Sequence, residues 1–234
     1  MRLNRLNPSV LGVLFAATCC LAGQSPQSIN GTAPAGEMSF TYKFENPRFH
    51  LRVIEIDISA DGAGELRFVR GESDELLDCK VKLLPATVAR ISRLIEVADL
   101  LGSTNEYQDK IDMSHLGWIT IGVKQGARER KVRFNHTINE QMKELGDIFR
   151  GIATQEISLF DIDNAQRYQP LDLPKQLEVL ESDLRLEWIA EPERVLKVLI
   201  EIAGDDTQPL IARNHARRII EAIKKGKYKS PVKK

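Results

Sequence analysis

The spacing of apolar residues changes along this chain of 234 residues, and the change constrains the fold more than any other feature. From Met38 onward apolar and polar residues alternate, as at Phe40, Tyr42 and Phe44, which is typical of strands with one buried face. From residue 171 onward apolar residues recur every three or four positions, which is typical of amphipathic helices. The chain is therefore expected to build a sheet first and a helical part after it.

Two helical stretches interrupt the strand region. One begins at Pro85 and ends before Gly102, and the other follows Thr137-Ile138-Asn139-Glu140, where Thr137 is expected to cap the helix. Strands before, between and beside these helices make residues 38–155 an α+β domain. We expect a mostly antiparallel sheet with the two helices packed on one of its faces.

The segment Asp57-Ile58-Ser59-Ala60-Asp61-Gly62 begins like a calcium-binding EF-hand loop. The twelfth position, where a bidentate Glu is needed, is Phe68, and the flanking segments have strand patterns. Asp61-Gly62 therefore predicts a hairpin turn. A register change near Val53 predicts a β-bulge in the preceding strand.

Residues 156–170 are expected to form a connector, and the pattern after it is purely helical. Residues 171–226 then predict a small all-α part, either a helical hairpin or a three-helix segment. The final stretch, 227–234, is a basic tail that continues the lysines at the end of the last helix.

Within the helical part, Asp172 and Thr207 are expected to cap the first and last helices. Trp188 is expected to end the apolar stripe of the first helix. With its consecutive amphipathic helices and short turns, this part resembles a single HEAT-type repeat.

The N-terminus has the three regions of a cleavable signal peptide. Arg2 and Arg5 precede an apolar run at 10–21, and small residues follow up to Gly23. The run is shorter than the roughly 20 residues that span a bilayer. Residues 1–23 therefore predict export to the periplasm or the extracellular space, with a buried N-terminal helix as the alternative.

After the signal, residues 24–37 are expected to be a flexible linker rich in Ser, Pro and Gly. Two further possibilities concern cysteine. Cys20 offers an alternative fate in which it is lipidated and anchors the protein. Without Cys19 and Cys20, Cys79 would be the only thiol, so no internal disulfide is expected. Cys79 lies in an alternating pattern and is expected to be a small buried hydrophobe.

The charge balance argues against nucleic-acid binding. The chain has 33 basic and 33 acidic residues, and removal of Arg2 and Arg5 would leave 31 basic residues. Such a chain has no general positive field to attract phosphates. The basic tail at 227–234 is expected to be a solvated chain end, or to contact an anionic surface peripherally.

Known catalytic and metal-binding motifs are not found. The four histidines are not spaced as ligand pairs, and neither a nucleophile elbow nor a phosphate-binding loop is present. We therefore predict no catalytic residue, metal or cofactor. The one candidate is the polar loop from Tyr107 to Leu116, where Tyr107, Asp109, Asp112 and His115 could converge.

The order of patterns from Phe40 to about Ile152 resembles an uncharacterised domain family of bacterial secreted proteins. The shared features are an aromatic first strand, the segment ending in Asp61-Gly62, a helix ending Ala98-Asp99-Leu100-Leu101, and the strands Trp118-Ile119-Thr120-Ile121 and Val132-Arg133-Phe134-Asn135. The resemblance implies an α+β fold and an exported protein, and it implies no activity or site.

The sequence leaves three functional hypotheses. The first is a non-catalytic module that binds a protein or polymer in the cell envelope or outside the cell. The second is an enzyme with a site in the 107–116 loop. The third is a structural or self-associating envelope protein. The specific partner and the oligomeric state stay open.

Overall fold

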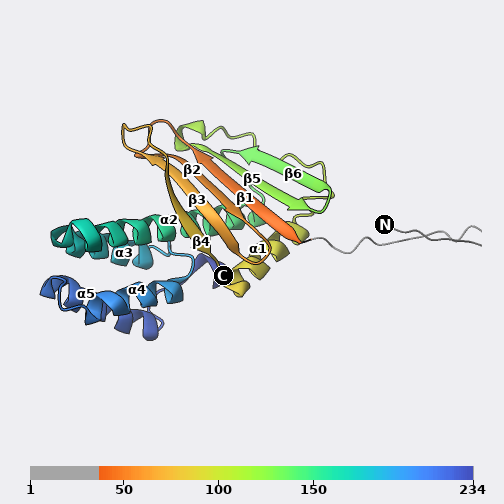
Figure 1. Ribbon diagram of the computed structural model, residues 1–234. Coiled ribbons are helices and arrows are strands. Elements are labelled where there is room, and N and C mark those ends of the chain that lie inside the picture. The colour runs from red at the N-terminus through yellow and green to blue at the C-terminus, as the bar shows by residue number, and fades with distance from the viewer. Residues whose placement is uncertain (1–36, 234) are drawn as a thin grey trace, which may run out of the picture. The chain divides into compact units, whose positions relative to one another are not determined.

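The computed structural model describes residues 37–233, and in this part of the chain six strands form one antiparallel sheet (Figure 1). The strands are β1 Met38–Glu45, β2 Leu51–Ile58, β3 Ala63–Arg70, β4 Leu77–Lys82, β5 Trp118–Gln125 and β6 Arg128–Phe134. Their spatial order is β4-β3-β2-β1-β5-β6, so β1 lies between β2 and β5. The predicted signal peptide at 1–23, the lipidation alternative at Cys20 and nearly all of the linker at 24–37 lie outside the described residues.

The alternating pattern places every second side chain of the central strands in the core. Phe40 and Tyr42 of β1 are 1% and 3% exposed. Tyr42 lies opposite Ile56 of β2 and Ile121 of β5, which are also buried. Full burial of a large apolar side chain contributes about 1.5–3 kcal/mol. The buried side chains of the central strands therefore form one apolar face of the sheet, and their burial stabilises it.

The hairpin between β2 and β3 confirms the two local predictions made for it. The register between these strands shifts beside Val53, as expected of a bulge. In the turn, Asp61 Oδ1 accepts hydrogen bonds from the hydroxyl of Ser59 at 2.6 Å and from the backbone N–H of Ala63 at 3.1 Å. Gly62 has a φ of 80°, which an L-residue rarely adopts. The segment is a β-turn, and the Asp61 carboxylate stabilises it by accepting hydrogen bonds within the turn.

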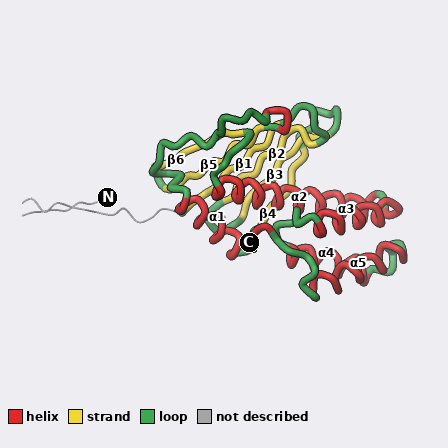
Figure 2. The backbone as a smooth tube through the Cα atoms, turned by 180° about the vertical axis from the view of Figure 1, so that it is seen from behind, coloured by secondary structure: helices red, strands yellow, loops and turns green. Residues whose placement is uncertain are grey.

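Two helices, α1 (Pro85–Val97) and α2 (Glu140–Tyr168), cover one face of the sheet (Figure 2). Ile91 of α1 and Phe149 of α2 are fully buried in the core that they share with the strands. The ring of Phe149 stacks on Tyr42 with 5.3 Å between the ring centroids. The predicted α+β fold, with two helices on one face of an antiparallel sheet, is confirmed.

The connector predicted at 156–170 is wrong, because α2 continues without a break to Tyr168. No glycine or proline occurs between Gly151 and Pro170, so nothing in this stretch stops the helix. The apolar pattern weakens because the helix changes partner. Ile157 still belongs to the core of the sheet, whereas Ile162 is buried in a second cluster with the helices that follow.

Three helices form this second cluster together with the end of α2. They are α3 (Leu173–Arg185), α4 (Pro192–Gly204) and α5 (Leu210–Lys224). The prediction of a small three-helix segment after the sheet is confirmed. Its fully buried side chains include Leu173, Leu177, Leu180, Ile189, Val195, Leu199, Ile202 and Ile219.

The N-cap of α2 is Asn139 and the cap predicted at Thr137 is wrong. The Asn139 side chain accepts a hydrogen bond from the backbone N–H of Met142 at 2.9 Å. The hydroxyl of Thr137 instead accepts from the backbone N–H of Asn139 at 3.2 Å. Thr137 therefore orders the residues before the helix, and the helix begins later than the sequence pattern indicated.

Three further details of the helical part differ from expectation. Asp172 occupies the N-cap position of α3, as predicted, but its side chain forms no capping hydrogen bond. The hydroxyl of Thr207 bonds to the Asp205 carboxylate at 2.7 Å, and α5 starts later, after Pro209. Trp188 lies beyond the end of α3 and is 49% exposed. The chain leaves the helix at Glu187, which has a φ of 61°.

Candidate functional site

The polar loop predicted as a candidate site lies between α1 and β5 and runs beside β6, an edge strand of the sheet (Figures 1 and 2). It includes a short 3₁₀ helix at Ser114–Leu116. An unpaired edge strand is a surface on which other chains can add, and proteins commonly cover it. The contacts of the loop show how this edge is covered.

Tyr107 points away from solvent and is 7% exposed. Its hydroxyl donates a hydrogen bond to the backbone carbonyl of Ala98 at 3.0 Å and lies 3.3 Å from the hydroxyl of Ser103. The guanidinium of Arg130 lies over its ring, 5.9 Å from the centroid. Tyr107 therefore anchors the loop to the end of α1.

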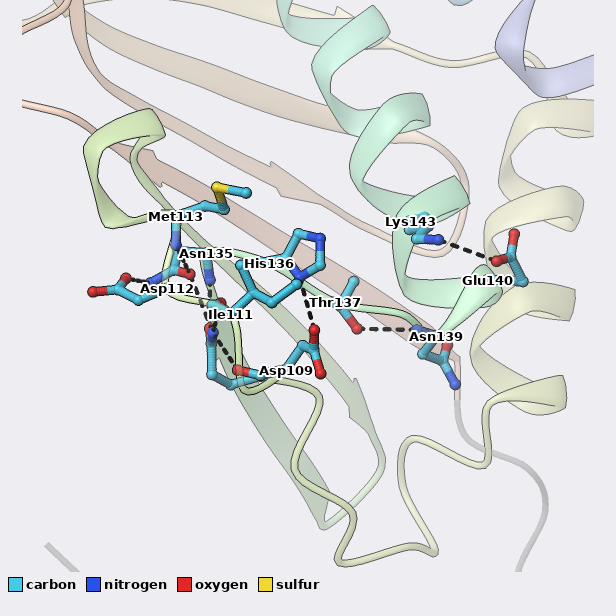
Figure 3. A network of polar contacts seen from close by, with 11 residues as sticks. Asp109, Ile111, Asp112, Met113, Asn135, His136, Thr137, Asn139, Glu140 and Lys143 are labelled. Atoms are coloured by element: carbon cyan, nitrogen blue, oxygen red, sulfur yellow. Dashed lines mark hydrogen bonds and ion pairs between the residues drawn. The ribbon is translucent and has the colours of Figure 1, made fainter.

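Asp109 and Asp112 bond to the residues that follow β6, as Figure 3 shows. Asp109 Oδ2 lies 3.2 Å from Nδ1 of His136. Asp112 Oδ1 accepts from the Asn135 side-chain amide and from the backbone N–H of Ser114, both at 2.8 Å. The two carboxylates thus fasten the loop to the end of the edge strand.

Both carboxylates are held in the ionised form. Hydrogen bonds from the backbone N–H groups of Lys110 and Ile111, together with His136, lower the pKa of Asp109. Hydrogen bonds from the backbone N–H and hydroxyl of Ser114 lower the pKa of Asp112. A general acid at neutral pH needs a raised pKa, so these carboxylates are suited to accepting hydrogen bonds.

His115 takes part through its backbone. Its carbonyl accepts a hydrogen bond from the Asn46 side chain at 3.1 Å, while its imidazole is on the exposed surface. The four predicted residues are therefore bonded to four different neighbours, Ala98, His136, Asn135 and Asn46. The structure does not draw their side chains together around one point.

Arg130 holds the other end of the loop, and sequence reasoning missed it. Its guanidinium donates hydrogen bonds to the carbonyls of Leu100 at 3.0 Å and Asn105 at 2.6 Å, and to the carbonyl and hydroxyl of Ser103. At the far end, Gln108 accepts from the backbone N–H of Asn135 at 2.7 Å. The loop is thus clamped to both ends of β6. No local pattern announces these pairs, because their partners lie 25 or more residues away.

The face of the sheet opposite α1 and α2 is the larger polar surface. We define the open face by the residues that alternate with the inward-facing ones: Ser39, Thr41, Lys43, Glu45, Glu55, Asp57, Glu65, Arg67, Lys80, Thr120, Gly122, Lys131 and Arg133. One row across it reads Lys80, Glu65, Asp57, Thr41, Gly122 and Lys131 in the strand register.

Ion pairs order the charged side chains of the open face. Arg67 lies 2.5 Å from Asp57 and 3.5 Å from Glu55, and Lys80 lies 2.6 Å from Glu65. Bonding to Lys80 lowers the pKa of Glu65. Such partly exposed pairs add little to stability individually, so their effect is to fix where each charge stands.

A hollow of about 520 Å³ opens on this face. We call it the open-face hollow. Its polar lining is Ser39, Thr41, Asp57, Ser59, Glu65 and Lys80, and its apolar lining is Phe40, Ile58, Ala63 and Gly64. Short side chains at Ser39, Thr41 and Ser59, together with Ala63 and Gly64, line the hollow beside the longer side chains of Glu65 and Lys80. The hollow offers carboxylate and hydroxyl oxygens to a ligand.

A buried polar cluster joins the start of α4 to α1 and α2, and no sequence pattern indicated it. Gln155 accepts from the backbone N–H of Glu191 at 2.7 Å. Arg194 donates to Glu156 at 2.5 Å and to Glu191 at 3.1 Å. Burial raises the pKa of Glu156, against the effect of Arg194. The groups satisfy one another, so this joint is structural.

Cys79 of β4 packs partly buried against the sheet core. Burial raises the pKa of its thiol to about 12, so at neutral pH the side chain is a neutral thiol and a poor nucleophile. Within residues 37–233 no group of three or more His, Cys, Asp and Glu side chains is placed to hold a metal ion. No helix in that range has both the length and the apolar character to cross a bilayer.

Comparison with known proteins adds no relative to this description. No protein-family model matches the chain, and no curated protein is similar to it at a significant level.

Proposed function

We propose that the chain is a non-catalytic module of an exported protein, and that it binds a protein or polymer partner through the open face of its sheet. Export rests on the signal-peptide pattern of residues 1–23. The binding role rests on the geometry of the open face.

The observation that carries the proposal is the open-face hollow. Two helices cover one side of the sheet and leave the other side uncovered, with this hollow over β1 to β4. A ligand lying in it would meet hydroxyl groups on Thr41 and Ser59 and the carboxylates of Asp57 and Glu65. Arrays of fixed acceptors suit a partner rich in hydroxyl or amide donors.

The electrostatics favour binding over acid–base chemistry. Arg67 and Lys80 fix the neighbouring carboxylates, and the lowered pKa of Glu65 keeps it ionised. Fixed and ionised acceptors bind a polar partner without rearrangement, which reduces the entropy cost of association. The 107–116 loop gives less support to an enzyme, because its polar groups bond to the edge strand.

Photochemical cross-linking tests the proposal. A photoreactive phenylalanine derivative replaces Thr41 at the centre of the open face, and in a matched variant it replaces Lys197 on the exposed side of α4. We expect the Thr41 position to capture one distinct partner from an envelope fraction and Lys197 to capture none. Equal labelling from both positions, or none from Thr41, would refute the open face as the binding surface.

A further inference from the structure

The outward side of α5 carries two parallel rows of residues at a spacing of seven, which is about two helical turns. Leu210, Arg217 and Lys224 form the first row, and Ile211, Arg218 and Lys225 form the second. All six side chains are exposed. The opposite side of α5 is buried against the other helices of this part. Each row therefore begins with an apolar residue and continues with two basic residues.

The chain after α5 extends this surface. Gly226, with a φ of 65°, ends the helix in a Schellman motif, in which the N–H groups of Gly226 and Lys227 bond to the carbonyls of Ile223 and Ala222 at 2.9 and 3.0 Å. Lys227 and Lys229 then point outward, alternating with Tyr228 and Ser230, which are part-buried and buried.

The basic tail predicted at 227–234 is thus anchored over its first part, where a solvated chain end was one expectation. The hydroxyl of Tyr228 donates to Glu181 of α3 at 3.3 Å. The hydroxyl of Ser230 donates to the carbonyl of Ala190, and Pro231 packs close to Gly151 of α2. These contacts keep Lys227 and Lys229 next to the end of α5.

Most of this charge is free to act on a partner. Within residues 37–233, Arg218, Lys224, Lys227 and Lys229 form no ion pair with another side chain. Glu221 is the one acidic residue of α5, and it bonds to Lys225 at 3.3 Å. A cluster of unpaired cations on one side of a fixed helix creates a local positive potential although the chain as a whole is neutral.

We propose that this basic α5 surface, comprising Leu210, Ile211, Arg217, Arg218, Lys224, Lys225, Lys227 and Lys229, docks on the surface of a bilayer that contains anionic lipids. The basic side chains complement lipid phosphates. Leu210 and Ile211 are 60% and 68% exposed at the start of the same rows, where they can enter the headgroup region. These two apolar residues are the reason to choose a bilayer over a soluble polyanion.

This surface lies on a different element from the open face, and the inference does not depend on the proposed function. Together the two would let the protein lie on a membrane through α5 while its sheet engages another molecule. Either could fail alone, because the variants that test them share no residue.

Vesicle flotation tests the inference with the full chain. Vesicles of phosphatidylglycerol and phosphatidylcholine in equal amounts are compared with vesicles of phosphatidylcholine alone, which report any binding by the apolar stretch at 10–21. We expect the full chain to bind the anionic vesicles more tightly, and added salt to weaken that difference.

The decisive variant is Arg218→Gln with Lys224→Gln, because neither side chain has an ion-pair partner to lose. Each charge should account for about 5-fold in affinity, so the double variant should bind anionic vesicles about 25-fold more weakly. The matched control is Lys110→Gln with Lys124→Gln, which removes the same charge from the loop and from β5. Circular dichroism checks that both variants are folded.

Three results would overturn the inference. One is an equal loss of vesicle binding in the double variant and its control, and another is no preference of the unaltered chain for anionic vesicles. The third is unchanged vesicle binding by Ile211→Ser together with strong binding of the unaltered chain to inorganic polyphosphate, which would make the surface a polyanion site.

Discussion

The carboxylate of Glu191 accepts a hydrogen bond from the hydroxyl of Thr87, which lies 104 residues earlier in the chain. The same oxygen accepts from the backbone N–H of Leu84 at 2.8 Å. Glu191 stands immediately before α4, and Thr87 is in the first turn of α1. One buried carboxylate thus joins the helical part to a helix of the sheet domain.

Replacement of Glu191 by Ala should therefore be strongly destabilising. It would leave the buried Thr87 hydroxyl and the part-buried Leu84 N–H without an acceptor and would remove one partner of Arg194, at a cost of about 3–5 kcal/mol in the free energy of unfolding. Urea denaturation measures the effect. Glu201→Ala, on the exposed side of α4, is the control and should change the free energy of unfolding by less than about 0.5 kcal/mol.

The clamp formed by Arg130 leads to a second prediction. In Arg130→Ala the carbonyls of Leu100, Ser103 and Asn105 lose their donor, so the loop should detach from β6 at a cost of about 2 kcal/mol. In this variant, amide hydrogen exchange in residues 103–109 should become faster than in the unaltered chain, whereas exchange in α2 should not change. Arg128→Ala, which removes only a contact with Gln125, should leave exchange in the loop unchanged. Similar exchange in both variants would mean that the loop is held by other contacts.

The lowered pKa of Asp112 predicts the pH dependence of stability. Because the folded-state pKa lies below the usual 3.8, the ionised carboxylate stabilises the fold above about pH 4, and this contribution is lost as the pH falls through the folded-state pKa. Asp112→Asn keeps one oxygen that can accept from the Ser114 N–H and the Asn135 amide, and it removes the charge and the acceptor for the Ser114 hydroxyl. The unaltered chain should be the more stable of the two at neutral pH, and the difference should shrink below about pH 4. Denaturation curves at a series of pH values would contradict this if the difference stayed constant.

Two glycines should respond to alanine in opposite ways. A Cβ atom at Gly64 of β3 would clash with the carbonyl oxygen of Asp57, so the strands would have to move, at a cost of about 1–3 kcal/mol. A Cβ at Gly146 of α2 would meet only Ile119, at 3.8 Å. Gly146→Ala should therefore stabilise the protein by up to about 1 kcal/mol through helix propensity. Melting temperatures of the two variants should move in opposite directions.

The sequence contained enough to predict the sheet because strand patterning is local. Phe40, Tyr42 and Ile56 alternate with polar neighbours, and the pleat turns that alternation directly into one buried face. The hairpin turn at Asp61-Gly62 was equally local. Neither prediction required knowledge of which strands become neighbours.

The extent of α2 could not be read in the same way. Ile157 and Ile162 point into different clusters, so the helix loses a single apolar stripe although it continues. A hydrophobic pattern reports a constant environment, and it fails where one helix passes from a sheet core to a helical core.

The 107–116 loop shows that a functional site is also hard to predict from sequence spacing alone. Asp109, Asp112 and His115 are residue types used in catalysis, and their closeness in the sequence made a site conceivable. Their role depends on His136, Asn135 and Asn46, which the fold brings from other segments. Sequence spacing cannot show that such polar groups serve to cover an edge strand.

The continuous course of α2 has a consequence for dividing the protein. Its first half completes the core beneath the sheet, and its last turns complete the helical cluster. A cut anywhere between residues 156 and 170 would remove from one fragment the α2 side chains that complete its core. We therefore expect that neither part folds without the other. Truncation, domain exchange and independent expression would each remove residues of α2 that one of the two cores requires.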